Sequence, residues 1–374
     1  MSLIGVSLEP PLDPRSWSGS SHHLFGQLMQ LGVVRDALHV RPAPWRERLL
    51  QIESFAWPRE RWRARYNASP ARFRMLSACA REAVRAGGSA SGVLQIGARM
   101  SVAGTGMPPV FGYHDGNAAL RYRHFDQGLI TSSRRDQHLA WEGQVYSGMR
   151  GIFLMSSWLA SSFMKDFGIP ASRLHVVGAG INFAQLPVPM ARDFSRPHFL
   201  FVGKEFERKG GPVLLEAFAQ AKRALPHARL TIVGPASIPA AGPGVECAGF
   251  LSKSDPAQAA RLLALFGEAT TMVLPSLYEP FGISLLEGMA NGMACLAVDR
   301  CAMPEIVQHG RTGVIVAAGD PVALARGMVE IGSQPELAAE MGRLGRLRIE
   351  ADYTWPAVTK RMRDVLRDDY QLVE

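Results

Sequence analysis

The chain has 374 residues, of which 47% are hydrophobic, and a formal net charge of +8. This length and apolar content can bury a large core and predict about two domains. The positive charge favours anionic partners, namely phosphorylated ligands, nucleic acid or an acidic membrane surface. No apolar run approaches the ~20 residues that a membrane-spanning helix needs, which excludes an integral membrane protein of that kind.

The cysteines carry neither C-x-x-C nor Cys/His ligand spacing: Cys79, Cys247, Cys295 and Cys301. They are typical of buried thiols in a reducing compartment and not of a disulfide framework. Residues 1–8 are too short for a secretory signal. The sequence has no D-x-D metal motif and no internal repeat. We therefore expect a cytoplasmic protein without a metal site.

The chain begins with a strand, a turn and a helix. The apolar run at 3–8 predicts a buried strand. A helix follows, capped by Ser20 or Ser21, with apolar residues at helical spacing through Leu31. The turn between them holds Gly19 within Trp-Ser-Gly-Ser. Such a turn can hold a phosphate, but it can equally be an ordinary turn, and both interpretations stay open.

A strand is predicted at 36–40, and residues 45–86 are helical in pattern and unusually basic. Within 57–86 the arginines are Arg59, Arg61, Arg63, Arg65, Arg72, Arg74, Arg81 and Arg85, interleaved with Trp57, Trp62, Tyr66 and Phe73. This composition is compatible with a solvated helix face whose aromatic residues pack inward, or with contact to an anionic membrane. Tracking nucleic acid is the weakest of the three interpretations.

Two more strands are predicted at 92–96 and 109–113, and the second is followed by His114, Asp115, Gly116 and Asn117. A histidine at the carboxyl end of a strand is well placed for chemistry, so His114 is a candidate site residue. The alternative is a turn, because Asp-Gly-Asn is a favourable turn sequence by itself. Strands at 151–156 and 174–177 flank a helix at 157–167.

Glycine, proline and mixed polar residues at 178–197 interrupt the strand–helix alternation and predict the domain boundary. We place one domain at 1–190, a second at 191–355 and a terminal helical segment at 356–374. A second series of strands is predicted at 198–202, 229–233, 245–249, 271–274, 294–298 and 314–316, with helices between them. Two blocks of alternating strand and helix predict an α/β protein with two parallel-sheet domains.

The strand at 198–202 leads into a basic, glycine-containing loop. Lys204, Arg208 and Lys209 lie there between Gly203 and Gly210. Flexible backbone and fixed positive charge suit a diphosphate. The alternative is a solvated charged loop.

The strand at 271–274 leads into a loop with Glu279, Phe281 and Gly282, and a helix begins near residue 283. This edge of a parallel sheet is where ligands bind. Glu279 and Glu287 can accept hydrogen bonds from sugar hydroxyls, while the amides of Phe281 and Gly282 can donate. Glu287 has a structural alternative, because Ser284-Leu-Leu-Glu287 fits a capping box. Glu305 falls at the next strand–helix turn.

These motifs stand in order along the chain: Val202-Gly203-Lys204, Lys209-Gly210, Glu279-Pro-Phe-Gly-Ile283, Glu287-Gly-Met-Ala290, Pro304-Glu305-Ile-Val307 and Gly310-Arg-Thr-Gly313. The set resembles the group 1 glycosyltransferases, that is, glycosyltransferase family 4. The resemblance is strong over 154–316 and thin before residue 150. It implies a GT-B fold, with two facing Rossmann-like domains, the acceptor on the first, the nucleotide sugar on the second and the active site in the interdomain cleft.

The resemblance also implies roles for individual residues. Lys204 and Lys209 would hold the diphosphate, with Gly203 and Arg208 in the same loop. Glu287 would bind the ribose, and Glu279 with the Phe281 and Gly282 amides would orient the donor sugar. His114 would touch that sugar, Gly19 would pass near the phosphates, and Glu305 would line the rim. The segment 356–374 would cross back to the first domain. Two features depart from the family: Lys204 replaces an arginine, and the first glycine-rich loop is reduced.

The expected activity is a retaining, metal-independent sugar transfer from a nucleotide-diphosphate sugar to a hydroxyl acceptor, with no cofactor. The acceptor would be a glycan, a lipid-linked sugar or a small molecule. A nucleotide-sugar epimerase on the same fold and a non-catalytic scaffold that binds sugar nucleotides or membrane remain as alternatives. We expect a cytoplasmic location, with peripheral contact to the inner membrane face through 57–86 left open. The sequence does not identify the nucleotide, the sugar or the acceptor.

Overall fold

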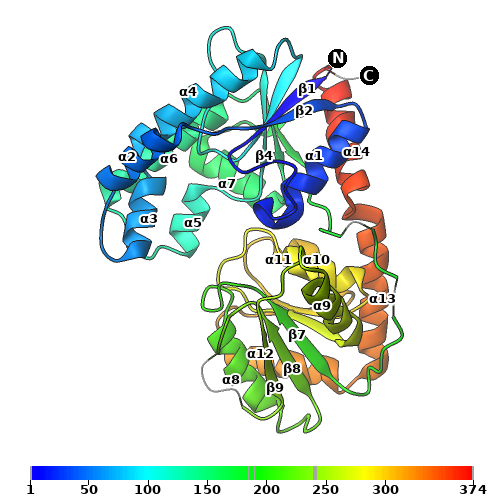
Figure 1. Cartoon of the computed structure of the whole chain (residues 1–374). Helices are drawn as coiled ribbons and strands as arrows, with labels where there is room; N and C mark the ends of the chain where they lie inside the picture. Colours follow the sequence, from blue (N-terminus) through cyan, green and yellow to red (C-terminus); the bar gives the residue numbers. More distant parts are fainter. Residues whose placement is uncertain (1, 184, 189, 239–241, 373–374) are drawn as a thin grey trace. The chain divides into compact units, whose positions relative to one another are not determined.

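The computed structural model describes residues 2–183, 185–188, 190–238 and 242–372 (Figure 1). The chain divides into two compact units, one of Met1–Gly178 with Val358–Glu374 and one of Ala179–Ala357. The first unit therefore ends earlier than residue 190. The chain from Val358 onward is part of the first unit.

The first unit contains a parallel sheet with the strand order β2-β1-β3-β4-β5-β6 in the described part of the chain. Most of its strands are buried on both faces, as expected for a parallel sheet that helices cover. The strands are β1 (Leu3–Ser7), β2 (Val34–His39), β3 (Gly92–Ile96), β4 (Val110–His114), β5 (Gly151–Leu154) and β6 (Leu174–Val176).

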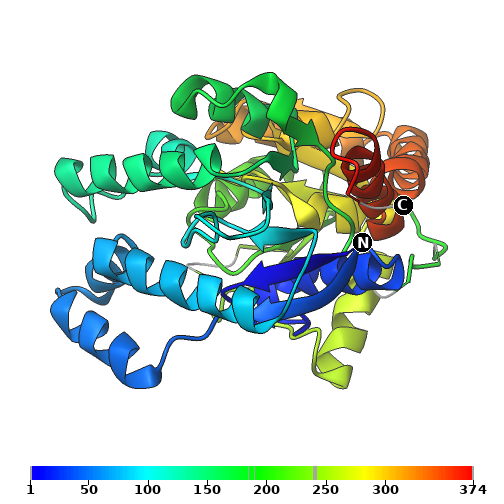
Figure 2. The ribbon, with the colours of Figure 1, turned by 90° about the horizontal axis from the view of Figure 1, so that it is seen from above.

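Helices cover both sides of this sheet (Figure 2). The helices of this unit, including α2 and α3, which lie away from the sheet, are α1 (Ser20–Gln30), α2 (Pro44–Glu53), α3 (Arg59–Asn67), α4 (Pro70–Ala86), α5 (Ala118–His124), α6 (Ser132–Ser147), α7 (Ser157–Phe167) and α14 (Trp355–Asp368), with short 3-10 turns η1 (Ser16–Gly19) and η2 (Ala171–Arg173). The predicted basic helical stretch is thus three helices. Prolines explain the breaks, because Pro44, Pro58 and Pro70 lie at their starts.

Helix α1 begins differently from the prediction. Its N-cap is Gly19, in the left-handed region with φ of 98°, and not Ser20 or Ser21. No side chain caps the helix, and both serines are buried within its first turn. Glycine adopts this backbone conformation without the steric cost that a Cβ imposes.

The second unit contains another parallel sheet, with the order β12-β11-β10-β7-β8-β9 in the described part of the chain. The strands are β7 (His198–Val202), β8 (Arg229–Val233), β9 (Val245–Gly249), β10 (Thr271–Leu274), β11 (Ala294–Val298) and β12 (Gly313–Val316). The helices are α8 (Gly211–Ala221), α9 (Pro256–Glu268), α10 (Ile283–Ala290), α11 (Met303–Ile306), α12 (Pro321–Gly332) and α13 (Pro335–Asp352). Two parallel sheets with covering helices confirm the predicted fold class.

Strand order sets the place for a ligand in each unit. From β7 the chain runs outward through β8 and β9, and it then returns to β10 on the other side of β7. The switch point of the second sheet is therefore between β7 and β10, and that of the first sheet is between β1 and β3. In open α/β sheets, ligands bind at the carboxyl ends of the strands beside such a point.

No helix in the described part of the chain is long and apolar enough to cross a bilayer.

The loops after β7 and β10 are in direct contact. The Leu277 amide donates to the Arg208 carbonyl at 3.0 Å. A Cβ on Gly210 would lie 2.1 Å from the Pro275 carbonyl oxygen. Gly210 also has a φ of 74° and is the N-cap of α8. Glycine is therefore needed here both for its backbone conformation and for the close approach of the second loop.

We predict that Gly210→Ala lowers the thermal unfolding midpoint far more than Gly292→Ala. Gly292 has a φ of 75° but nothing within 4 Å of its ideal Cβ, so that substitution carries only the left-handed backbone cost, roughly 1–2 kcal/mol. Gly210→Ala adds a backbone clash to the same cost. Equal midpoints in calorimetry would show that the loops can separate without loss of stability.

Candidate active site

The second unit brings together two of the predicted side chains, Lys209 and Glu279. The Lys209 ammonium lies 2.6 Å from Glu279 Oε2, and the two side chains are only 15% and 14% exposed. Lys209 follows β7 and Glu279 follows β10, so the ion pair spans the switch point of this sheet. A positive group suited to phosphate and a carboxylate suited to hydroxyls are thus held side by side.

Arg208 belongs to the same cluster. Its guanidinium forms an ion pair with Glu205, donates to the Tyr278 carbonyl and lies 3.6 Å from Glu279. Burial disfavours the charged form, but the Glu279 and Glu205 carboxylates outweigh it and raise the pKa of Arg208. The arginine is therefore a permanent positive charge fixed to both loops.

Lys204 lies apart from this ion pair. Its ammonium stands over the Phe250 ring, 4.2 Å from the centroid, and it makes no ion pair with a carboxylate among the described residues. Gly203 lies where Lys209 passes, because a Cβ on Gly203 would come 2.1 Å from Lys209 Cδ. The glycine thus leaves room for the Lys209 side chain along the loop backbone.

Helix α10 begins directly after this loop, with Gly282 as its N-cap. Phe281 is buried and its ring packs against Tyr353, with centroids 6.4 Å apart. The N-terminus of α10 thus follows Glu279 closely in the chain, and a helix N-terminus favours anionic or polar groups.

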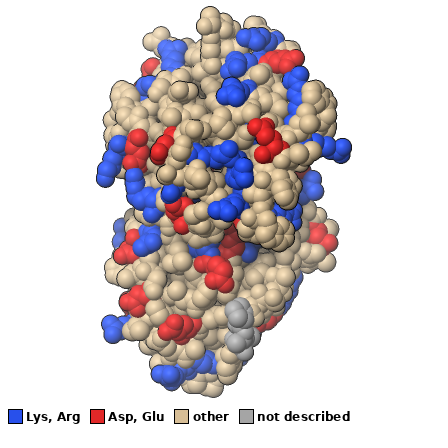
Figure 3. Space-filling view, turned by 90° about the vertical axis from the view of Figure 1, so that its left-hand side faces the viewer, with Lys and Arg blue, Asp and Glu red and all other residues tan. Residues whose placement is uncertain are grey.

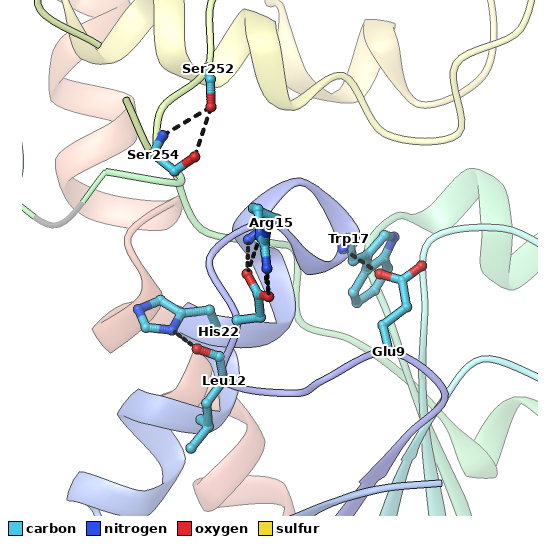
Figure 4. Close-up of polar contacts among 8 residues, drawn as sticks. Glu9, Leu12, Arg15, Trp17, His22, Ser252 and Ser254 are labelled. Carbon is cyan, nitrogen blue, oxygen red and sulfur yellow. Dashed lines mark hydrogen bonds and ion pairs between the residues drawn. The ribbon is translucent and has the colours of Figure 1, made fainter. Parts of the chain in front are cut away.

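The capping-box alternative for Glu287 is wrong. Ser284 is inside α10 and not at its N-cap, and its buried hydroxyl has no hydrogen-bond partner. Glu287 instead forms an ion pair with Lys253, through Oε1. Lys253 was not predicted from the sequence, because it lies in a loop 34 residues away. The hydroxyls of its neighbours Ser252 and Ser254 are 2.8 Å apart and hydrogen-bonded to each other (Figure 4).

Glu305 lies in the first turn of α11 and is half-buried. Its carbonyl accepts a hydrogen bond from Arg348 at 2.7 Å, which fixes the backbone of the turn. Among the described residues, no group of histidine, cysteine, aspartate and glutamate side chains could hold a metal ion.

In the first unit the turn before Gly19 is strained. Trp17 and Ser18 have φ of 46° and 57°, in a region that residues with a Cβ rarely adopt. The Glu9 carboxylate accepts from the Trp17 amide at 2.7 Å (Figure 4), and Asp115 accepts from its indole at 3.2 Å. The ring also packs edge-on against Tyr113. Several contacts therefore hold a costly backbone at the switch point of this sheet.

His114, which the resemblance predicts to touch the donor sugar, is buried at the carboxyl end of β4. Its side chain is only 2% exposed and lies against the rings of Tyr146 and Phe163, with Nε2 lacking a hydrogen-bond partner. Burial lowers the pKa of His114 to about 3, so the imidazole is neutral near pH 7. The imidazole is therefore a buried polar group among aromatic side chains. Asn117, the last residue of the predicted turn sequence, is the N-cap of α5, and its side chain caps that helix.

The chain was compared with known proteins. Residues 196–334 match the sequence model of the family described as Glycosyl transferases group 1. Glycogen synthase from Mycobacterium tuberculosis (strain CDC 1551 / Oshkosh) is 29% identical over 251 residues, which cover 61% of this chain and 59% of that protein. Alpha-maltose-1-phosphate synthase from Mycolicibacterium smegmatis is 28% identical over 244 residues, which cover 58% of this chain and 62% of that protein. The chain thus spans about three fifths of these relatives.

Among solved structures, sucrose-phosphate synthase from Thermosynechococcus elongatus matches with a TM-score of 0.74 and 17% identity, over 99% of both chains. This likeness covers both units and shows the fold, which is GT-B. Over residues 196–334, the matched family model confirms the resemblance of the sequence motifs to the group 1 glycosyltransferases.

The buried His114 generates a prediction for acid stability. Its pKa is about 3 in the folded chain and near 6.5 when unfolded, so below pH 6.5 the unfolded chain binds the extra proton and stability falls. One such proton corresponds to about 1.4 kcal/mol per pH unit. His114→Phe should therefore show a shallower loss of thermal stability between about pH 6 and pH 4 than the wild type. Half-buried His138 and buried His198, whose pKa values burial lowers to about 4, keep some slope in both proteins.

Comparing slopes and not absolute midpoints separates titration from any packing defect of the larger ring. Parallel pH profiles for the two proteins would contradict the assignment of a neutral, proton-resistant His114.

Proposed function

We propose that this chain, whose residues 196–334 match the group 1 glycosyl transferases, transfers a sugar from a nucleotide-diphosphate sugar to a hydroxyl acceptor. The observation that carries the proposal is the cluster of Lys209, Arg208 and Glu279 across the switch point of the second unit, beside the N-terminus of α10. The two relatives are named for making glycogen and alpha-maltose-1-phosphate, which supports a carbohydrate product.

In this proposal the second unit binds the donor. Lys209, with Arg208 and Lys204 on the same loop, faces the diphosphate, and the α10 amides add partial positive charge. Glu279 accepts hydrogen bonds from the donor sugar, with the Phe281 and Gly282 amides near it, and Glu287 accepts from the ribose. Lys253 holds one oxygen of Glu287 and so orients that carboxylate. The acceptor, a glycan, a lipid-linked sugar or a small molecule, binds the first unit.

The proposed reaction retains the anomeric configuration. The bond from the anomeric carbon to the diphosphate oxygen breaks, and its electron pair leaves with the nucleoside diphosphate. The acceptor oxygen forms its bond on the same face, and its proton passes to the departing phosphate. Positive side chains meet the charge that develops on the leaving group, so the proposal includes neither a metal ion nor a resident cofactor.

The test uses the purified full chain with donors based on UDP, GDP, ADP and TDP and a panel of carbohydrate acceptors. We expect one nucleotide to raise the thermal midpoint, and its sugar to be transferred with retained configuration by NMR. Activity should be unchanged by EDTA. A donor sugar altered without any acceptor would indicate an epimerase instead. Nucleotide binding with no turnover on any acceptor would indicate a scaffold.

Glu279→Gln should lower kcat/KM on the order of 100-fold, because the amide loses the charge that Lys209 and Arg208 hold in place. The matched control is Glu246→Gln. The Glu246 carboxylate is exposed, forms an ion pair with Arg261 at 3.2 Å and is not part of the Lys209, Arg208 and Glu279 cluster. That control should keep full activity. Unchanged turnover in Glu279→Gln would remove this residue from the site.

A further inference from the structure

Helix α2 exposes an apolar face. Trp45, Leu49 and Ile52 are 60%, 58% and 71% exposed, and their spacing places them on one side of the helix. Phe55 and Trp57 continue this surface into the α2–α3 turn, at 64% and 80% exposed. These five residues, which we call the α2 apolar surface, are more than a third of the fourteen exposed large hydrophobic residues in the described part of the chain.

The side of α2 opposite this surface faces the protein and carries the half-buried residues Glu47, Leu50 and Gln51. Tyr66 donates to Glu47 at 2.9 Å, and the Trp62 indole donates to the Gln51 carbonyl at 2.7 Å. All residues of α2 and α3 are described, and none of them is buried. A helix on a globular protein normally buries its apolar stripe. Here the Trp45, Leu49 and Ile52 side of the helix faces outward, and hydrogen bonds to α3 fix that orientation.

Exposed basic side chains lie on the same two helices and on the segment before them. Six exposed arginines make no ion pair among the described residues: Arg41, Arg46, Arg48, Arg59, Arg61 and Arg63. The Arg46 guanidinium lies over the Trp45 ring. Figure 3 views the molecule from the side on which α2 and α3 lie, and basic side chains there stand among broad uncharged areas. Figures 1 and 2 place α2 and α3 at the end of α4 away from the sheet.

We propose that the α2 apolar surface and its arginines dock the chain on an anionic lipid bilayer. Tryptophan prefers the interface between headgroups and acyl chains, and leucine, isoleucine and phenylalanine bury apolar area below it. Arginines beside them pair with anionic headgroups. Charge complementarity favours this partner, because residues 41–65 contain seven arginines and three glutamates. This docking does not depend on which sugar the chain transfers.

The surface differs from the one expected from the sequence. Helix α4, which supplies the second half of residues 57–86, buries Leu76, Ala80 and Val84 against the unit. Its arginines are partly engaged as well, because Arg81 donates to the Ser101 carbonyl and Arg72 stacks on Tyr66. The membrane-facing stretch is therefore 41–63 and not 57–86.

The experiment measures co-sedimentation of the full chain with vesicles of phosphatidylcholine, with and without phosphatidylglycerol. We expect strong binding only to the anionic vesicles, weakened by salt, and a blue shift of tryptophan emission on binding. Leu49→Ser with Ile52→Ser should lower the partition coefficient at least about tenfold, since each side chain loses its apolar burial. The matched control, Leu263→Ser with Val322→Ser, removes two exposed apolar residues from the second unit and should bind as the wild type does.

Both double variants change exposed residues, so their thermal midpoints should match the wild type, and this is checked in the same samples. Equal binding of the Leu49/Ile52 variant and the wild type would overturn the proposal, as would equal binding to neutral and anionic vesicles. A lipid-free dimer that the Leu49/Ile52 variant dissociates would also overturn it, because the surface would then join two copies of this chain.

Discussion

The ion pair between Lys209 and Glu279 is the interaction on which the second unit's site depends. Both side chains are largely withdrawn from water, so each charge carries a desolvation cost that only its partner offsets. Such a pair contributes little net stability, but removing one partner leaves a poorly solvated charge. Its main effect is positional, because it fixes the loop after β7 against the loop after β10. The close contact at Gly210 acts in the same direction.

A comparable constraint operates in the first unit, by different means. Residues Trp17 and Ser18 keep a left-handed backbone whose cost is roughly 1–2 kcal/mol per residue. The Glu9 carboxylate and the Asp115 carboxylate bind the same tryptophan from two loops. Strain of this kind persists only where the surroundings determine the conformation. In both units, therefore, acidic side chains fix a loop at the switch point of a parallel sheet.

The strands, the helices and the parallel sheets were predictable, because local periodicity and turn residues carry them. The pairing of Glu287 was not. Its spacing from Ser284 suits a capping box, whereas its actual partner, Lys253, is distant in sequence and approaches only through the fold. His114 shows a related limit. The sequence places it at the end of β4, but whether a strand end opens to solvent depends on neighbours such as Tyr146 and Phe163.

Helix α2 shows why the direction of an amphipathic helix cannot be deduced from its pattern alone. The apolar residues Trp45, Leu49 and Ile52 have the spacing that normally marks a buried face, and the inward-packing interpretation of the basic segment follows from that rule. The rule assumes that water is the only alternative to the core. Here the Glu47 side chain and the Gln51 carbonyl accept hydrogen bonds from α3 on the opposite side of the helix, so the face with Trp45, Leu49 and Ile52 stays exposed. Nothing in the described part of the unit removes the apolar area of these five large side chains from water. At a lipid interface, acyl chains would cover that area and anionic headgroups would pair with the neighbouring arginines.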